Sequence, residues 1–172
     1  MKILILHTPR VGATSLMESL AKEHNAVAVK NPISEVFTDE NIPWGEENLV
    51  VKQDMLYPLG NKYDVDSDKV NFYTELAGKF DIVRLIVRND LVSQAESFGY
   101  MLDNPEQEGK KYNYRKISEE HLLNCLVHVQ QLEVGLRKVR AKINGEIECY
   151  EDLFDQFSAA RHRQIKEEGR LI

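Results

Sequence analysis

The stretch Ile3-Leu4-Ile5-Leu6-His7-Thr8-Pro9-Arg10-Val11-Gly12-Ala13-Thr14-Ser15-Leu16 decides the fold of this chain. Its apolar run at 3–6 is typical of a strand that is buried on both faces of a parallel sheet. A tight loop containing Gly12 follows, and residues 14–23 have the pattern of a helix. A strand, a loop and a helix start in this order bring unpaired backbone N–H groups to one point, which suits a phosphate or a sulfate.

The loop lacks the Gly-Lys-Ser/Thr ending of the loop that binds nucleoside triphosphates with magnesium. Arg10 stands before the glycine instead, and the hydroxyls of Thr14 and Ser15 follow it. The sequence therefore predicts an anion site for a different donor. A small-molecule or nucleotide kinase remains a less favoured alternative, and magnesium-dependent ATP hydrolysis would revive it.

Composition narrows the class of protein. With 172 residues, 42% of them hydrophobic, the chain is expected to form one domain over residues 1–172 with a sizeable core. Its net charge of −6 argues against nucleic-acid binding. The two cysteines lack metal-ligand spacing, so we expect free thiols and no metal. The first apolar run is too short for a signal peptide or a membrane span, and a cytoplasmic protein without a membrane partner is expected.

Apolar runs and turn residues recur along the chain and predict an alternation of strands and helices. This alternation predicts an α/β fold of three layers, with a mostly parallel five-stranded sheet. Strands are expected at 2–6, 26–29, 49–52, 82–87 and 146–150. Helices are expected at 14–23, 68–79, 90–101 and 118–142, followed by a helical tail at 151–170.

Three other strand ends carry polar residues, and ligands in open α/β sheets bind beyond the carboxyl ends of the strands. Arg88 follows the strand at 82–87, and Ser97 lies in the next helix, so the two side chains are candidates to clamp a second phosphate. Lys52 ends the strand at 49–52, and Tyr150-Glu151-Asp152-Leu153 closes the last strand.

These segments resemble, in order over residues 3–153, the sulfotransferases that use 3′-phosphoadenosine 5′-phosphosulfate (PAPS). Pro9-Arg10-Val11-Gly12-Ala13-Thr14-Ser15-Leu16 resembles the 5′-phosphosulfate loop of that family, which commonly reads Pro-Arg/Lys-Ser-Gly-Thr-Thr-Ser/Trp-Leu. Arg88-Asn89-Asp90 with Gln94-Ala95-Glu96-Ser97 resembles its 3′-phosphate motif and is closest to the bacterial trehalose-type branch. Val50-Val51-Lys52 and Tyr150-Glu151-Asp152-Leu153 are similar to two further strand ends of the family.

The resemblance implies a P-loop-like nucleotide-binding topology and a role for each matching residue. Arg10 is expected to neutralise charge on the bridging oxygen, and Arg88 and Ser97 are expected to bind the 3′-phosphate. Lys52 is expected to be catalytic, and no metal is required. The loop residues expected to hold the 5′-phosphosulfate, through their backbone N–H groups and two hydroxyls, are Val11, Gly12, Ala13, Thr14 and Ser15.

A base must take the proton from the acceptor hydroxyl. Glu35 is the candidate, because the trehalose-type branch carries its catalytic Glu in a similar Arg-Pro-x-Glu-x-Phe setting; here the Glu is displaced by one residue relative to Pro32. Asp39, Glu40 and His7 remain alternatives.

The expected activity is sulfuryl transfer from PAPS to a hydroxyl of a small-molecule or carbohydrate acceptor. Position 13 is Ala where a hydroxyl is common, and this favours the alternative of a non-catalytic module that binds PAPS or its desulfated product. Few residues follow the last matching segment, so we also expect a compact version of the fold, with a homodimer as one way to complete it.

Overall fold

The computed structural model describes residues 1–33, 36–56, 67–104, 117–143 and 145–157. Within these ranges a five-stranded sheet has the order β2-β3-β1-β4-β5, and every pair of neighbouring strands is parallel. The strands are β1 (Lys2–His7), β2 (Val27–Lys30), β3 (Leu49–Asp54), β4 (Ile82–Val87) and β5 (Ile147–Cys149). β1 therefore lies in the middle of the sheet, with β3 on one side and β4 on the other.

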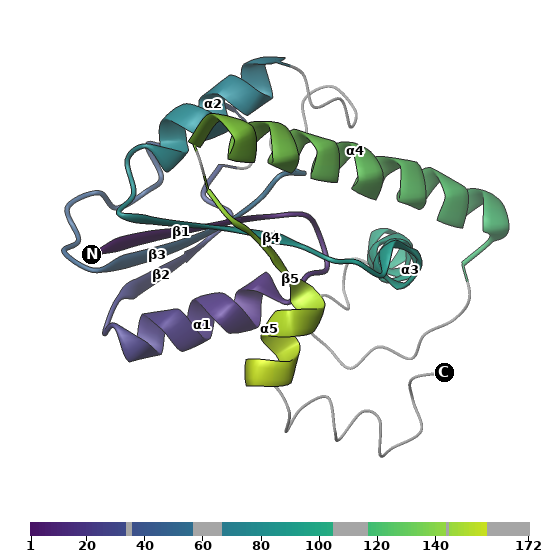
Figure 1. The fold of residues 1–172 in the computed structure, drawn as a ribbon, viewed down its shortest axis with the longest axis horizontal. Coiled ribbons are helices and arrows are strands. Elements are labelled where there is room, and N and C mark those ends of the chain that lie inside the picture. The colour runs from purple at the N-terminus through teal and green to yellow at the C-terminus, as the bar shows by residue number, and fades with distance from the viewer. Residues whose placement is uncertain (34–35, 57–66, 105–116, 144, 158–172) are drawn as a thin grey trace.

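Helices cover both faces of the sheet and complete three layers. α2 and α4 lie over one face, and α1 and α5 lie over the other, while α3 packs beside α4 (Figure 1). The helices are α1 (Ala13–Glu23), α2 (Ser67–Ala77), α3 (Leu91–Asp103), α4 (Glu119–Ile143) and α5 (Tyr150–Phe157). None of these described helices is both long enough and apolar enough to cross a membrane.

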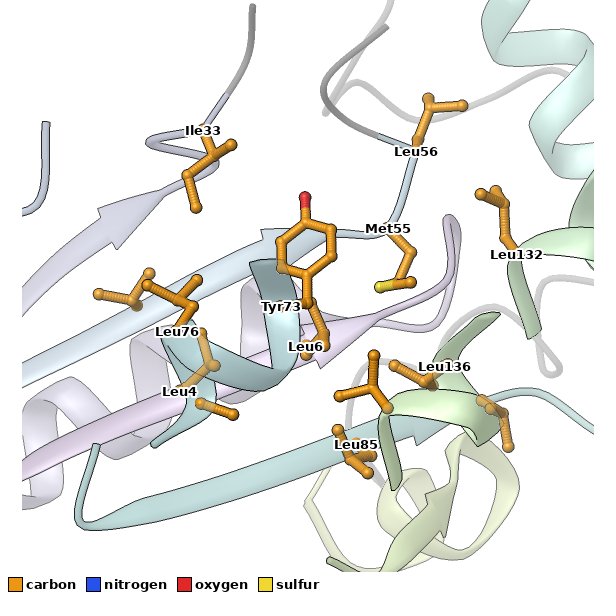
Figure 2. Packing of buried hydrophobic residues seen from close by; sticks show 14 of the residues in the cluster. Leu4, Leu6, Ile33, Met55, Leu56, Tyr73, Leu76, Leu85, Leu132 and Leu136 are labelled. Atoms are coloured by element: carbon orange, nitrogen blue, oxygen red, sulfur yellow. The ribbon is translucent and has the colours of Figure 1, made fainter. Parts of the chain in front are cut away.

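The apolar run of β1 supplies both halves of the core, because successive side chains of a strand point to opposite faces. Leu4 and Leu6 pack under α2 and α4, where Tyr73 and Leu136 close over them (Figure 2). Ile3 and Ile5 belong to a second cluster with four buried residues of α1: Ala13, Leu16, Met17 and Leu20. The expectation of a strand buried on both faces is therefore confirmed.

β1, β2, β3 and β5 differ from their expected bounds by one or two residues, whereas β4 has the expected bounds. β3 continues beyond residue 52 to Asp54, because its pairing with β1 extends to His7 opposite Asp54. The polar Gln53 can lie in the interior there because its side-chain amide bonds both the N–H and the C=O of Ile33. β5 is shorter than expected, since Tyr150 already begins α5.

Two of the helix starts follow from local side-chain capping. Asp90 precedes α3 and its Oδ1 accepts a hydrogen bond from the Ser93 N–H at 3.0 Å. Ser118 precedes α4 and its Oγ accepts from the His121 N–H at 3.2 Å. α1 begins differently, because Gly12 stands at its N-cap in a left-handed conformation with no side-chain cap. The first helix therefore begins without a side-chain capping hydrogen bond from the described residues.

Candidate anion-binding site at the carboxyl edge of the sheet

The loop between β1 and α1 leaves successive backbone donors unused. Arg10 has φ 63° and Gly12 has φ 68°, so two left-handed residues turn the chain before the helix. The N–H groups of Ser15 and Leu16 turn back to the Gly12 carbonyl, at 3.0 and 3.3 Å. Within the described ranges no acceptor is found for the N–H groups of residues 11–14. Successive unpaired N–H groups in a turn before a helix form a concavity suited to an anion.

Gln94 of α3 fixes the start of this loop. Its Nε2 donates to Thr8 Oγ1 at 2.9 Å and to the Pro9 carbonyl at 2.5 Å, and its side chain is wholly buried. The Thr8 N–H also donates to the Ile86 carbonyl of β4 at 3.3 Å. The sequence indicated no role for Gln94, because this contact joins residues 86 positions apart.

Arg10 and Ser97 connect the two motifs found in the sequence. Arg10 Nε donates to Ser97 Oγ at 2.8 Å, and Ser97 is 5% exposed. The hydroxyl that was expected beside Arg88 thus orients the loop arginine. The left-handed conformation of Arg10 is uncommon for a residue with a side chain, and backbone strain of this kind needs support from its surroundings. The bonds from Ser97 and Gln94 supply that support.

Lys52 lies beside the N-terminus of α1. Its Nζ donates to Thr14 Oγ1 at 3.2 Å, and the residue is only 5% exposed. Val50 on the same strand faces α1, and residues two apart in a strand share a face. Lys52 therefore lies on the face of β3 that packs against α1, and this explains why it reaches the start of the helix. The structure therefore brings Arg10, Thr14 and Lys52 together around the loop.

Arg88 occupies a neighbouring position at the end of β4. Its guanidinium stacks on the Tyr150 ring at 4.8 Å, and its Nε lies 4.0 Å from Glu151 Oε1. That Nε is buried and has no hydrogen-bond partner among the described residues. The Glu151 carboxylate also accepts from the N–H groups of Asn89 and Asp90, each at 3.1 Å. A protein carboxylate therefore occupies backbone donors next to the arginine that was predicted to hold a phosphate.

Asp54 is a site residue that the sequence reasoning missed. It ends β3 opposite His7, is 8% exposed, and its Oδ2 lies 4.0 Å from His7 Nδ1. Burial raises the pKa of Asp54 to about 6, although a hydrogen bond from the Leu56 N–H and the charges of Lys52, Lys69 and Arg10 oppose this shift. The signal that could have found it is its spacing of two from Lys52, which puts both side chains on one face.

His7 is a poor candidate for the base. Burial lowers the pKa of the His7 imidazole to about 3, and the nearby Lys52 charge adds to this effect. Its Nδ1 lies 2.6 Å from the Thr8 carbonyl, which requires Nδ1 to donate, and its Nε2 is buried without a described partner. At neutral pH the ring is uncharged, so its contact with Asp54 is not an ion pair.

Asp39, another candidate for the base, does not lie beside the loop. Glu35 lies outside the described residues. Asp39 pairs with Lys79 at 2.6 Å, and Lys79 lies over the ring of Trp44. The Trp44 carbonyl accepts from Lys2 Nζ at 2.8 Å, which puts this group at the start of β1, the opposite edge of the sheet. Trp44 is therefore a packing residue at that edge.

Other side chains at the candidate site offer no metal ligands in a group. Among the described residues no three His, Cys, Asp or Glu side chains are close enough together to hold a metal ion. Cys125 and Cys149 are free thiols, and Cys149 Sγ lies 3.5 Å from Asn89 Oδ1. Among the described residues, the chemistry at this edge comes from backbone donors, from the cations Arg10, Lys52, Lys69 and Arg88, and from the buried carboxyl of Asp54.

The fold and the site define a three-layer α/β protein with a cradle of backbone donors between β1 and α1. No family model matches the chain. The chain is similar to a leucine–tRNA ligase of Methanocaldococcus jannaschii, with 26% identity over 152 residues. That stretch is 88% of this chain and 14% of the ligase, so the chain spans a small part of the length of the curated relative it matches. This degree of similarity does not assign the chain to a family.

Proposed function

We propose that this protein is a cytoplasmic sulfotransferase that moves a sulfuryl group from PAPS to a hydroxyl of a small-molecule or carbohydrate acceptor. The observation that carries the proposal is the run of N–H groups at residues 11–14 that have no acceptor among the described residues, with Arg10, Thr14 and Lys52 around them. Four sequence segments, each at the end of a strand, resemble segments of PAPS-dependent enzymes. This resemblance is the reason for proposing PAPS as the sulfuryl donor.

The residues present fit a phosphosulfate and a second phosphate. Sulfuryl transfer resembles phosphoryl transfer, an in-line displacement in which charge grows on the leaving phosphate. Unpaired backbone donors and fixed cations stabilise such charge without reorganising during the reaction. In this proposal the loop amides and Lys52 hold the 5′-phosphosulfate, and Arg10 neutralises the bridging oxygen. Arg88, which already lies at the end of β4, would bind the 3′-phosphate.

The proposal is tested by transfer of labelled sulfate from PAPS across a panel of hydroxyl acceptors. We expect Arg10→Ala to lower turnover by about 100-fold or more, as removal of one preorganised donor to a developing anion does, with a modest loss of affinity for the desulfated nucleotide. Arg137→Ala is the matched control, since Arg137 is exposed on α4 and pairs with Glu133. Thermal unfolding of both variants checks that each remains folded.

A second candidate function is a module that binds the nucleotide without transferring sulfate. Two observations favour it: Ala13 stands at a loop position where a hydroxyl is common in the family, and the Glu151 carboxylate lies beside Arg88. Binding of the desulfated nucleotide without turnover on any acceptor would support this function. Lack of binding of either nucleotide would contradict both.

A further inference from the structure

A buried carboxyl lies among the cations of the candidate site and has no role in the proposal so far. Asp54 follows Lys52 by two residues on β3, so the two side chains share the face on which Lys52 reaches Thr14. The positive charges of Lys52, Lys69 and Arg10 all act on the Asp54 carboxyl. Asp54 thus lies in the same cluster as the loop arginine and the strand lysine.

The backbone of Asp54 is held in place from two directions. Its N–H donates to Asn31 Oδ1 at 3.1 Å, and its carbonyl accepts from the Tyr73 hydroxyl at 3.5 Å. Lys69 of α2 donates to the next two carbonyls, those of Met55 and Leu56, at 3.2 and 3.4 Å. A group fixed by such contacts loses little freedom when it meets a substrate, and this favours a positioned proton acceptor.

The two oxygens of the Asp54 carboxyl differ in their surroundings. Oδ1 accepts from the Leu56 N–H at 2.9 Å, which fixes the plane of the carboxyl group. Oδ2 lies 4.0 Å from His7 Nδ1, beyond hydrogen-bond range, and that nitrogen donates to Thr8 instead. No described residue donates a hydrogen bond to Oδ2. One oxygen is therefore used to orient the group and the other is left to accept a proton.

We propose that the Asp54 carboxylate, rather than Glu35, takes the proton from the acceptor hydroxyl, an inference that rests on the proposed function. The acceptor oxygen forms a bond to sulfur as the bond from sulfur to the bridging phosphate oxygen breaks. The phosphate leaves with that electron pair, and the hydroxyl proton moves to Asp54 Oδ2. Atoms and charge balance with PAPS and the acceptor as the two reactants, and no other reagent is needed.

The charged groups around Asp54 give the reaction a defined pH dependence. Lys52 on β3, Lys69 on α2 and Arg10 in the loop are cations, and His7 on β1 is neutral above pH 3 because its pKa is about 3. Burial holds the pKa of Asp54 at about 6, close to the working pH expected of a general base. Because the base acts in its ionised form, kcat should rise with pH and reach half of its plateau near pH 6.

The test compares three variants of the full chain. Asp54→Asn keeps the shape of the side chain and an oxygen for the Leu56 N–H but cannot take a proton. Glu35→Gln tests the other candidate. Asp81→Asn is the matched control, because Asp81 accepts from the Lys2 N–H at 2.7 Å at the opposite edge of the sheet. The readouts are affinity for the desulfated nucleotide by calorimetry, kcat and KM for labelled sulfate transfer, and the pH profile of kcat.

We expect Asp54→Asn to lower kcat by about 100-fold or more, to lose the acidic limb of the profile, and to bind the desulfated nucleotide within about threefold of wild type. Glu35→Gln and Asp81→Asn should keep the wild-type profile. An Asp54→Asn variant with wild-type kcat would overturn the inference and leave the proposed function intact, as would loss of turnover in Glu35→Gln alone. Absence of transfer by the wild-type protein would overturn both.

If Asp54→Asn does not fold, the pH profile of kcat for the wild-type protein still tests whether Asp54 is the base. An acidic limb near pH 6 supports Asp54, whereas a profile that is flat from pH 5 to 8 contradicts it. Addition of formate to Asp54→Ala supplies a second measurement, since a small carboxylate can replace the missing base. We expect formate to restore part of kcat in Asp54→Ala and to leave Asp81→Ala unchanged; no restoration in a folded Asp54→Ala protein counts against the inference.

Discussion

His7 and Asp54 should make the stability of this protein depend on pH in opposite directions, although they are neighbours. Burial lowers the pKa of His7 from 6.5 to about 3, so between these values the unfolded chain binds more protons and stability falls as pH falls. Burial raises the pKa of Asp54 from 3.8 to about 6, so between these values the folded chain binds more protons and stability rises as pH falls.

The size of each effect follows from the two pKa values of each group. Between pH 7 and pH 5, His7 should remove about 2 kcal/mol from the free energy of unfolding, and Asp54 should add about 1 kcal/mol. The two contributions partly cancel in the wild-type protein. When either group is removed, only the contribution of the other remains. The pH dependence of the free energy of unfolding therefore changes in opposite directions in the two variants.

Urea unfolding of wild type, His7→Asn and Asp54→Asn at pH 5 and pH 7 measures these contributions. On acidification, His7→Asn should gain about 2 kcal/mol relative to wild type, and Asp54→Asn should lose about 1 kcal/mol relative to wild type. Comparing each variant with wild type removes the contribution of all other titrating groups. If the change in the free energy of unfolding relative to wild type has the same sign in both variants, or is absent in both, the burial of these two groups at the ends of β1 and β3 would be refuted.

Three further perturbations test other contacts. Gln94→Leu leaves Thr8 Oγ1 and the Pro9 carbonyl without their buried donor, so urea unfolding should show a loss of about 1–3 kcal/mol; an unchanged midpoint would argue against this anchor. Glu151→Gln removes the negative charge beside Arg88, and because the carboxylate is partly exposed, the affinity for the desulfated nucleotide by calorimetry should rise by a factor of up to about 5; weaker binding would mean that Glu151 orients the arginine instead. Asn25 has φ 48°, so Asn25→Gly should be more stable than Asn25→Ala by about 1 kcal/mol in thermal unfolding, and equal stabilities would contradict the left-handed backbone.

The sheet could be predicted from the sequence because its strands are short apolar runs separated by helical segments. The run at 3–6 must be covered on both faces, and this requirement alone places β1 inside a sheet with helices on either side. The last two residues of β3 could not be predicted in the same way. Gln53 and Asp54 are polar, and they belong to a buried strand only because partners distant in sequence satisfy them, among them Ile33 and Asn31.

The site was predicted as a set of strand ends but not as a set of contacts. Residues Arg10, Thr14 and Lys52 were expected near one another because parallel strands end at one edge. The hydrogen-bond partners of these residues could not be predicted, because the partners are distant in sequence. Ser97 bonds Arg10 over a separation of 87 residues, and Glu151 accepts from the Asn89 N–H over a separation of 62 residues. Such pairings depend on how α3 and α5 pack, and no local pattern in the sequence encodes that packing.

Calorimetric titration with two nucleotides tests the central claim most directly. The desulfated product of PAPS carries phosphates at the 3′ and 5′ positions, whereas adenosine 5′-phosphate lacks the 3′ group. The account predicts that wild type binds the bisphosphate about 10- to 100-fold more tightly, and that Arg88→Ala removes most of this preference while Arg137→Ala keeps it. Equal affinity of the wild-type protein for the two nucleotides, or no binding of either, would contradict the account.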